Sequence, residues 1–181
     1  MSKKIIFLHT TLLFFLTLPN AVIAEPLLVN DKTTKIISMA ATVPESTRQL
    51  LIGMVSYCSA FGEESRNAFN TTFSTWLQRH QGYLAESIRV KADLITLVKQ
   101  PGNPPSYQRD IQQMYEVAIP KMIAAKIARN TKPIEVLPDT RAKASRCIAD
   151  AKMVDQGLWD VKANHPDVAR FLDERLRGRM K

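Results

Sequence analysis

Apolar residues recur every three or four positions through most of this 181-residue chain, which is the spacing of one face of an α-helix. The first clear stripe follows the helix-start signal Pro44-Glu45-Ser46-Thr47 and ends before Gly62. Its members are Leu50, Met54, Cys58 and Phe61. The pattern predicts an amphipathic helix from about Pro44 to Gly62.

A second and longer stripe begins after Glu63 and Glu64, two acids whose charge suits the first turn of a helix. Gly82 lies in the middle of this stripe, so the spacing predicts either one long helix or two helices bent near Gly82. The apolar face is expected to hold Phe69, Phe73, Trp76, Leu77, His80, Leu84, Ile88, Leu94 and Val98.

The clearest break in the periodicity is Gln100-Pro101-Gly102-Asn103-Pro104-Pro105. Neighbouring prolines and a glycine cannot continue a helix, so the segment is expected to reverse the chain. A rigid exposed loop loses little entropy when it binds a partner. We therefore treat Pro101, Gly102, Asn103, Pro104 and Pro105 as a candidate recognition loop.

A third helix is expected after this loop, with Ser106 as its cap. A kink at Pro120 is favoured over a stop because the apolar spacing persists through Ile123 and Ile127. Its predicted buried face holds Tyr107, Ile111, Met114, Ala118, Met122 and Ala125. Pro133 and Pro138 are predicted to bracket the connector to the next helix.

Two more helices complete the pattern. One is predicted from its stripe of Ala144, Cys147, Ile148, Ala151, Val154 and Leu158. The other starts at Pro166, a residue favoured at the first helical position, and presents Val168, Phe171, Leu172 and Leu176. A basic tail, residues 177–181, is expected to fray.

No stretch shows the sustained alternation that marks a strand. The fold class is therefore predicted as all-α, a compact bundle of about five helices. We expect a single domain over residues 25–181, in which residues 25–43 form an N-terminal arm or a short helix.

The first 24 residues have the pattern of a signal peptide. Lys3 and Lys4 precede an apolar run of 14 residues from Ile5 to Leu18, and small residues lead to a predicted cut between Ala24 and Glu25. A membrane span needs about 20 apolar residues, so the mature chain is expected to have no stable membrane span. No cysteine follows the cut as a lipoprotein would require, which predicts a periplasmic or secreted protein of bacterial type.

Export changes the interpretation of the two cysteines, Cys58 and Cys147. Each lies on the apolar stripe of its helix, and an oxidising compartment favours a disulfide between them. Two reduced core cysteines are the alternative. A redox-active pair is disfavoured because its cysteines are usually two residues apart, whereas these are 89 apart.

Charge is unevenly distributed. The full chain has a formal net charge of +8, and loss of Lys3 and Lys4 with the signal peptide leaves 23 bases and 17 acids, or +6. Residues 99–132 hold six bases against two acids, which suits either an acidic partner or an ordinary solvated helix end. Bases do not alternate with exposed aromatics, so no nucleic-acid partner is predicted.

Catalytic, metal and cofactor motifs are not found in the sequence, and none of these sites is predicted. His80 and His165 have no second ligand at helical spacing. The aromatic cluster forms either a ligand pocket between helices or, more commonly for such a stripe, plain core. Its members are Phe69, Phe73, Trp76, His80 and Tyr83.

These observations favour an exported, non-enzymatic protein that binds another macromolecule in the cell envelope, such as an adaptor, an inhibitor or an immunity-type factor. A periplasmic carrier of a small molecule or lipid is the first alternative. A small envelope hydrolase that uses His80 or His165, with a carboxylate supplied by folding, is the second.

Overall fold

The computed structural model describes residues 32–179, which contain helices and no strand. The all-α prediction is thereby confirmed. The predicted signal peptide, residues 1–24, and its cleavage position lie outside the described residues. The elements are α1 (Lys32–Ala40), α2 (Val43–Cys58), η1 (Ser59–Phe61), α3 (Glu63–Val98), α4 (Pro105–Gln113), η2 (Met114–Ala118), α5 (Ile119–Glu135), α6 (Thr140–Asp155), α7 (Val161–Asn164) and α8 (Pro166–Arg179).

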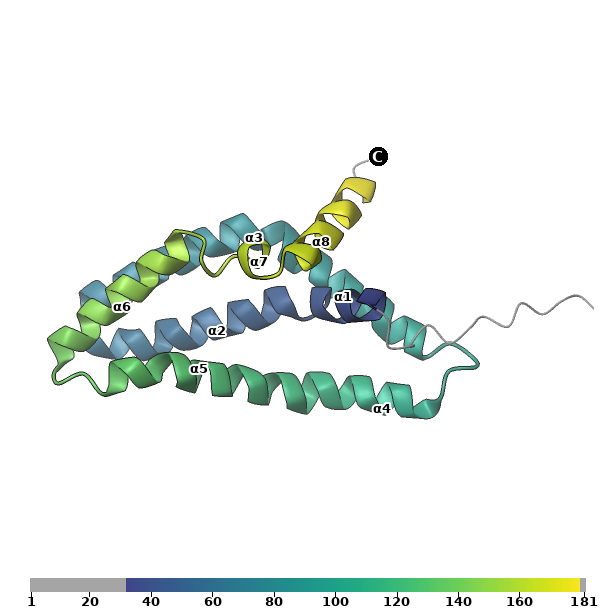
Figure 1. The fold of residues 1–181 in the computed structure, drawn as a ribbon, viewed down its shortest axis with the longest axis horizontal. Helices are drawn as coiled ribbons and strands as arrows, with labels where there is room; N and C mark the ends of the chain where they lie inside the picture. The colour runs from purple at the N-terminus through teal and green to yellow at the C-terminus, as the bar shows by residue number, and fades with distance from the viewer. Residues whose placement is uncertain (1–31, 180–181) are drawn as a thin grey trace, which may run out of the picture.

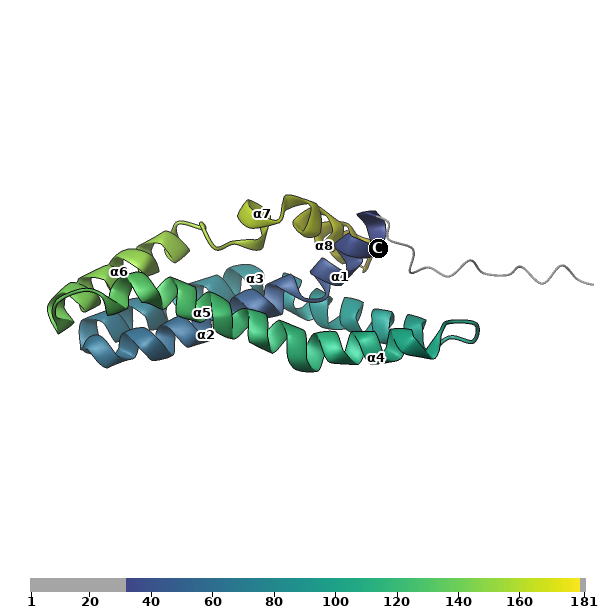
Figure 2. The ribbon, with the colours of Figure 1, turned by 60° about the horizontal axis from the view of Figure 1, so that its bottom comes forward.

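The helices form an elongated bundle organised around α3 (Figure 1). Helices α2 and α6 pack along α3, and α5 packs against α2 on the side away from α6. At the other end, α1 and α8 close over α3, with α7 beside α8 (Figure 2). Within residues 25–43, expected as an arm or a short helix, residues 32–40 form the short helix α1.

Helix α3 is continuous through Gly82, which answers the question of one helix or two. Gly62 precedes it with φ +119°, a conformation open to glycine because it has no Cβ. The predicted stripe is correct at Phe69, Trp76 and Leu94 but wrong at Ile88, which is 66% exposed. Glu86 and Ser87 are buried in its place.

Helices α4, η2 and α5 form one continuous helical rod from Pro105 to Glu135. Pro104 occupies the N-cap position and no side chain caps the helix, so the prediction of Ser106 as the cap was wrong. The turn Met114–Ala118 is π-helical, and such a turn holds one extra residue. It ends just before Pro120, where a kink was expected.

The extra residue shifts the buried stripe of the rod. Ala118, Met122 and Ala125, predicted to be buried, are exposed. Their places toward α2 are taken by Ile119, Ile123 and Ile127, each half-buried. An uninterrupted period of 3.6 residues predicts the wrong face beyond Met114 because it does not include the π turn.

Two further boundaries differ from prediction. Pro133 was predicted to begin the connector but lies inside α5, on its exposed side. Water can solvate there the carbonyl that proline leaves without a partner. The connector is therefore residues 136–139. Leu158, placed on the α6 stripe, is 54% exposed because α6 ends at Asp155 and Gly157 turns the chain at φ +84°. Helix α8 begins at Pro166, as predicted, and continues through Arg177 to Arg179, so the prediction of a frayed tail was wrong for residues 177–179.

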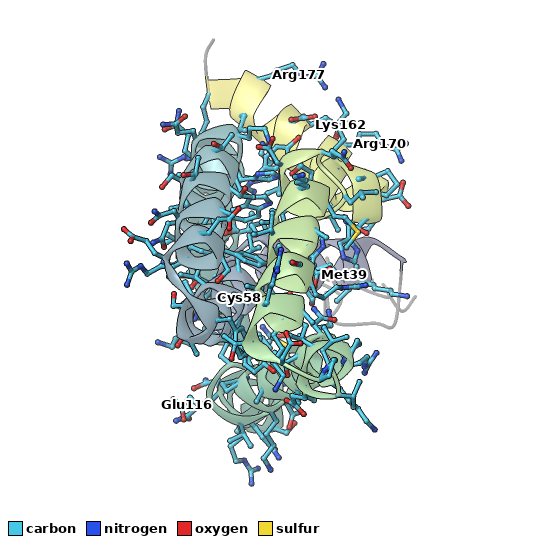
Figure 3. The ribbon with its side chains drawn as sticks, turned by 90° about the vertical axis from the view of Figure 1, so that its left-hand side faces the viewer. Met39, Cys58, Glu116, Lys162, Arg170 and Arg177 are labelled. Atoms are coloured by element: carbon cyan, nitrogen blue, oxygen red, sulfur yellow. A yellow bond between two sulfur atoms is a disulfide. The ribbon has the colours of Figure 1, made fainter. Side chains whose placement is uncertain are left out.

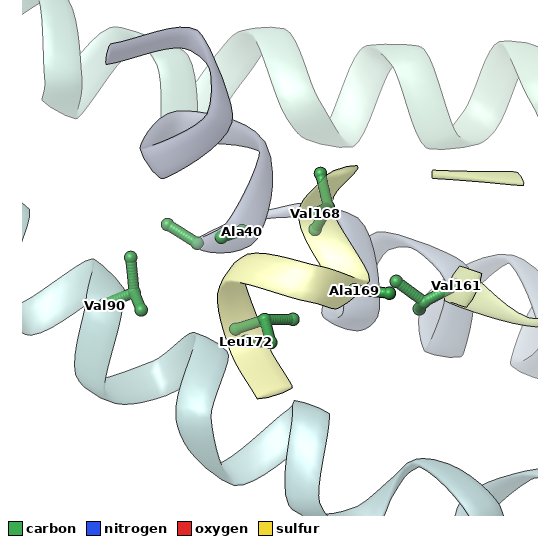
Figure 4. Packing of buried hydrophobic residues seen from close by; sticks show 7 residues of the cluster. Ala40, Val90, Val161, Val168, Ala169 and Leu172 are labelled. Carbon is green, nitrogen blue, oxygen red and sulfur yellow. The ribbon is translucent and has the colours of Figure 1, made fainter. Parts of the chain in front are cut away.

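The core consists of three clusters along the long axis. At one end, Met54, Phe69 and Ile134 surround the disulfide between Cys58 and Cys147, whose Cα atoms are 5.8 Å apart. The predicted disulfide is thus confirmed. Leu51, Trp76 and Val154 form the middle cluster. The third joins α1, α3, α7 and α8 through Ala40, Ala41, Val90, Val161, Val168, Ala169 and Leu172 (Figure 4).

Candidate functional site

His80, one of the two histidines of the predicted mature chain, is buried between α3 and the segment before α7. Its Nδ1 lies 2.9 Å from the carbonyl oxygen of Trp76, and its Nε2 lies 3.3 Å from the backbone nitrogen of Val161. Because a carbonyl only accepts and an amide N–H only donates, Nδ1 carries the proton and Nε2 accepts. The ring also stacks on Trp76, with centroids 4.2 Å apart.

These contacts leave His80 no free ring nitrogen for proton transfer. Asp160 Oδ1 lies 3.7 Å from Nε2 and itself accepts a 3.0 Å hydrogen bond from Arg79. Burial lowers the pKa of His80, although the Trp76 carbonyl and the Asp160 charge act in the opposite direction. The geometry suits a neutral histidine that ties α3 to α7.

His165 lies near the same segment, since its backbone N–H donates to the carbonyl of Val161 at 2.8 Å. Its side chain lines an open cleft of about 330 Å³ together with Lys126, Asn130 and Asp160. Burial and the charge of Lys126 lower the pKa of His165. Folding therefore brings both histidines beside Val161.

The predicted aromatic cluster lies mainly in the core. Phe69 and Trp76 are completely buried, and the indole Nε1 of Trp76 donates to the carbonyl of Trp159 at 3.3 Å. Phe73 and Tyr83 are half-buried. The hydroxyl of Tyr83 donates to Asp173 at 2.8 Å and thereby links α3 to α8.

A buried carboxylate, Glu86, was not expected from the sequence. Its Oε1 accepts hydrogen bonds from Arg175 at 2.6 Å and Arg179 at 3.0 Å, and its Oε2 accepts one from Arg89 at 3.0 Å. Burial alone would raise the pKa of Glu86, but these hydrogen bonds and the arginine charges hold the pKa below its ordinary value. Glu86 fastens α8 to α3.

The candidate recognition loop lies at the tip between α3 and α4. Pro101, Gly102 and Pro104 are exposed, and Gly102 has φ +97°. Asn103 is half-buried because its side-chain amide donates to the carbonyl of Leu97 at 2.7 Å. Pro105, assigned to the loop from the sequence, is the first residue of α4.

The rod presents a second surface, three of whose residues, Ala118, Met122 and Ala125, were predicted to be buried. Seven residues, all exposed, lie on the side of η2 and α5 opposite the half-buried isoleucines, and we call them the outer face. They are Val117, Ala118, Lys121, Met122, Ala125, Arg129 and Lys132. Val117 is 41% exposed and Met122 is 42% exposed. Glu116, next to this face, projects away from the bundle (Figure 3).

Among residues 32–179, no three histidine, cysteine or acidic side chains gather as a metal site requires. No helix in this range is both long enough and apolar enough to cross a bilayer.

Comparison of the chain with protein families, curated proteins and solved structures yields no match.

Proposed function

We propose that this chain is an exported, non-enzymatic binding protein of the cell envelope that contacts an acidic partner protein through the outer face. The observation that carries the proposal is the exposure of Val117 and Met122 among three cationic side chains on one face of the rod. An adaptor, an inhibitor or an immunity-type factor would use this surface to contact its partner.

The composition of this face suits a protein interface. Methionine and arginine are enriched at protein interfaces, and an apolar patch rimmed by charges is typical of them. Small side chains at Ala118 and Ala125 would let a partner helix approach closely. Met122 lies between them and can adapt its shape to the partner because it is unbranched.

The charges of the outer face are not used within the bundle. In the part of the chain that the structure describes, Lys121, Arg129 and Lys132 take part in no ion pair. Residues 99–132 hold six bases and two acids, and one of these acids, Glu116, accepts from Gln112 at 3.1 Å. This excess favours an acidic partner, which it would also attract over a distance.

Export is supported by the predicted signal peptide and by the disulfide, because such bonds persist in oxidising compartments. A hydrolase that uses His80 is not proposed, because both ring nitrogens of His80 are occupied by backbone groups.

The proposal is tested by photo-crosslinking in intact cells, with a benzophenone amino acid at position 122 of the outer face or at position 78 of α3. Both Met122 and Gln78 are exposed, so both positions tolerate the probe. We expect a protein adduct from position 122 only, formed through an acidic segment of the partner. Equal adducts from both positions, or adducts to lipid alone, would contradict the proposal.

A charge-reversal pair sharpens this test. Lys121→Glu with Arg129→Glu should abolish the adduct from position 122. The matched control is Lys152→Glu with Lys162→Glu, which reverses the same number of exposed charges away from the rod. Loss of the adduct in both double variants would indicate a general effect of net charge and would refute a specific face.

A further inference from the structure

A groove of about 490 Å³ opens where the rod diverges from α2 and α3, and we call it the Tyr115 groove. Ile88, Ile119 and Ile123 supply apolar walls, while Arg48 and Lys91 supply positive charge. Small-molecule sites have volumes of roughly 300 to 1,000 Å³, with apolar walls and a few polar groups. The Tyr115 groove falls within this description.

Two side chains in the groove lack the contacts that would stabilise the folded protein. The hydroxyl oxygen of Tyr115 is buried and has no hydrogen-bond partner. Ile88 lines the groove and is 66% exposed. An unpartnered buried hydroxyl lowers stability, and an exposed isoleucine contributes little to it. A ligand with an acceptor group and an apolar chain would satisfy both.

The charges of the groove favour a negative ligand. Arg48 is held by Glu45 through two hydrogen bonds of 2.7 Å, and Gln49 donates to the same carboxylate. The ammonium of Lys91 lies 4.0 Å from the ring centroid of Tyr115 and forms no ion pair among residues 32–179. Two cations and one acid leave the groove with one excess positive charge.

We propose that the Tyr115 groove binds an amphiphile with a single anionic head, of the fatty-acid or anionic-lipid class. The head pairs with Lys91, and the alkyl chain covers Ile88, Ile119 and Ile123. A small outward movement of the groove wall that now covers the Tyr115 hydroxyl lets the head accept a hydrogen bond from it. Burial raises the pKa of Tyr115 to about 12, so the hydroxyl keeps its proton. This site is separate from the outer face, which lies on the opposite side of the rod.

Calorimetric titration of the purified oxidised protein tests the inference. Dodecanoate should bind, and dodecyltrimethylammonium, with the same chain and the opposite charge, should not. Lys91→Gln should weaken dodecanoate binding about tenfold, whereas the exposed control Lys152→Gln should leave it unchanged. Equal binding of the two amphiphiles, or an unaffected Lys91→Gln, would overturn the proposal.

Tyr115→Phe separates a ligand role from a folding role. This variant loses only the unpartnered hydroxyl, so its melting temperature should equal or exceed that of the native protein, while dodecanoate binding falls about tenfold. Unchanged binding by Tyr115→Phe would overturn the assignment.

Vesicles containing anionic phospholipid test whether the ligand is a membrane lipid. Vesicle binding that depends on Tyr115 and Lys91 supports the proposal with a lipid as the ligand, and absence of binding to both dodecanoate and vesicles overturns it.

Binding of an amphiphile in the Tyr115 groove is independent of partner binding at the outer face. Lys121→Glu with Arg129→Glu should leave dodecanoate binding intact, and Tyr115→Phe should leave the adduct from position 122 intact. The two proposals therefore fail separately.

Discussion

Replacement of Glu86 by glutamine tests whether its buried charge holds α8 on α3. The side chain of Glu86 is 0% exposed, and its carboxylate accepts from three guanidinium groups. Glutamine has the same shape but no charge, and its amide group cannot accept the hydrogen bonds that one carboxylate oxygen now receives. The three arginines would then remain close together without a counterion.

The structure sets the size of this effect. Removing one partner of a buried ion pair costs about 3 to 5 kcal/mol. The arginine side chains here are 29%, 48% and 45% exposed for Arg175, Arg89 and Arg179, so water can solvate part of their charge. We therefore expect Glu86→Gln to lower the free energy of unfolding by about 3 kcal/mol, the low end of that range.

Asp93→Asn is the matched control. Asp93 accepts from Arg175 at 2.6 Å, but its side chain is 63% exposed, so its loss should cost about 1 kcal/mol or less. The assay is urea unfolding of the oxidised protein at neutral pH, followed by far-ultraviolet circular dichroism. Equal destabilisation by the two variants would refute the role assigned to Glu86.

The same variant has a pH signature. Because the folded protein holds the pKa of Glu86 below its ordinary value of 4.5, the stabilisation is present above that value and is lost as the pH falls through the lower folded pKa. Glu86→Gln should reduce this loss of stability in acid.

Three further predictions concern other parts of the bundle. Burial lowers the pKa of His80 below 6.5, so the unfolded chain takes up a proton at a higher pH than the folded protein does, and stability should fall as the pH drops below about 6.5. Urea titrations of His80→Gln should show a smaller loss of stability over this pH range. An unchanged loss would contradict the prediction. Gly53→Ala should lower stability by about 1 kcal/mol because a Cβ there would overlap Cδ1 of Ile127. Gly82→Ala, whose Cβ would make an ordinary 3.5 Å contact, should raise stability by about 0.5 to 1 kcal/mol. Thermal melts in which both variants change stability in the same direction would refute this packing of α5 on α2. Reduction of the disulfide, or Cys58→Ser with Cys147→Ser, should lower the free energy of unfolding by about 4 to 5 kcal/mol, because the bond closes a loop of 89 residues. A decrease below about 1 kcal/mol in urea titrations would contradict a stabilising role for the bond.

Much of the fold follows from short-range periodicity. The stripe around Met54 and Cys58 predicts α2, and prolines and glycines mark the chain reversal after α3. The disulfide was predictable because each cysteine lies on an apolar stripe and the signal pattern indicates export. These features depend on residues within a few positions of one another, and such spacing can be seen in a sequence.

Features that depend on distant or irregular contacts could not be predicted. Glu86 is buried because Arg175 and Arg179, about ninety positions away, neutralise its charge. The residues near Glu86 in the sequence do not indicate that α8 will pack over it. The π turn could not be predicted either, because the residues around it have the ordinary composition of an amphipathic helix. It reverses the interpretation of Met122 and Ala125 from core to surface, and with them the candidate binding face.

The π turn points the outer face to solvent and the isoleucine side of the rod to α2. Alkylation rates of single introduced cysteines in the oxidised protein, measured by intact mass, test it directly. We predict that Ala125→Cys reacts at least about tenfold faster than Ile123→Cys, because reactivity follows exposure. An uninterrupted helical period predicts the reverse order, and faster labelling at position 123 would contradict the orientation of the rod and the face proposed to bind a partner.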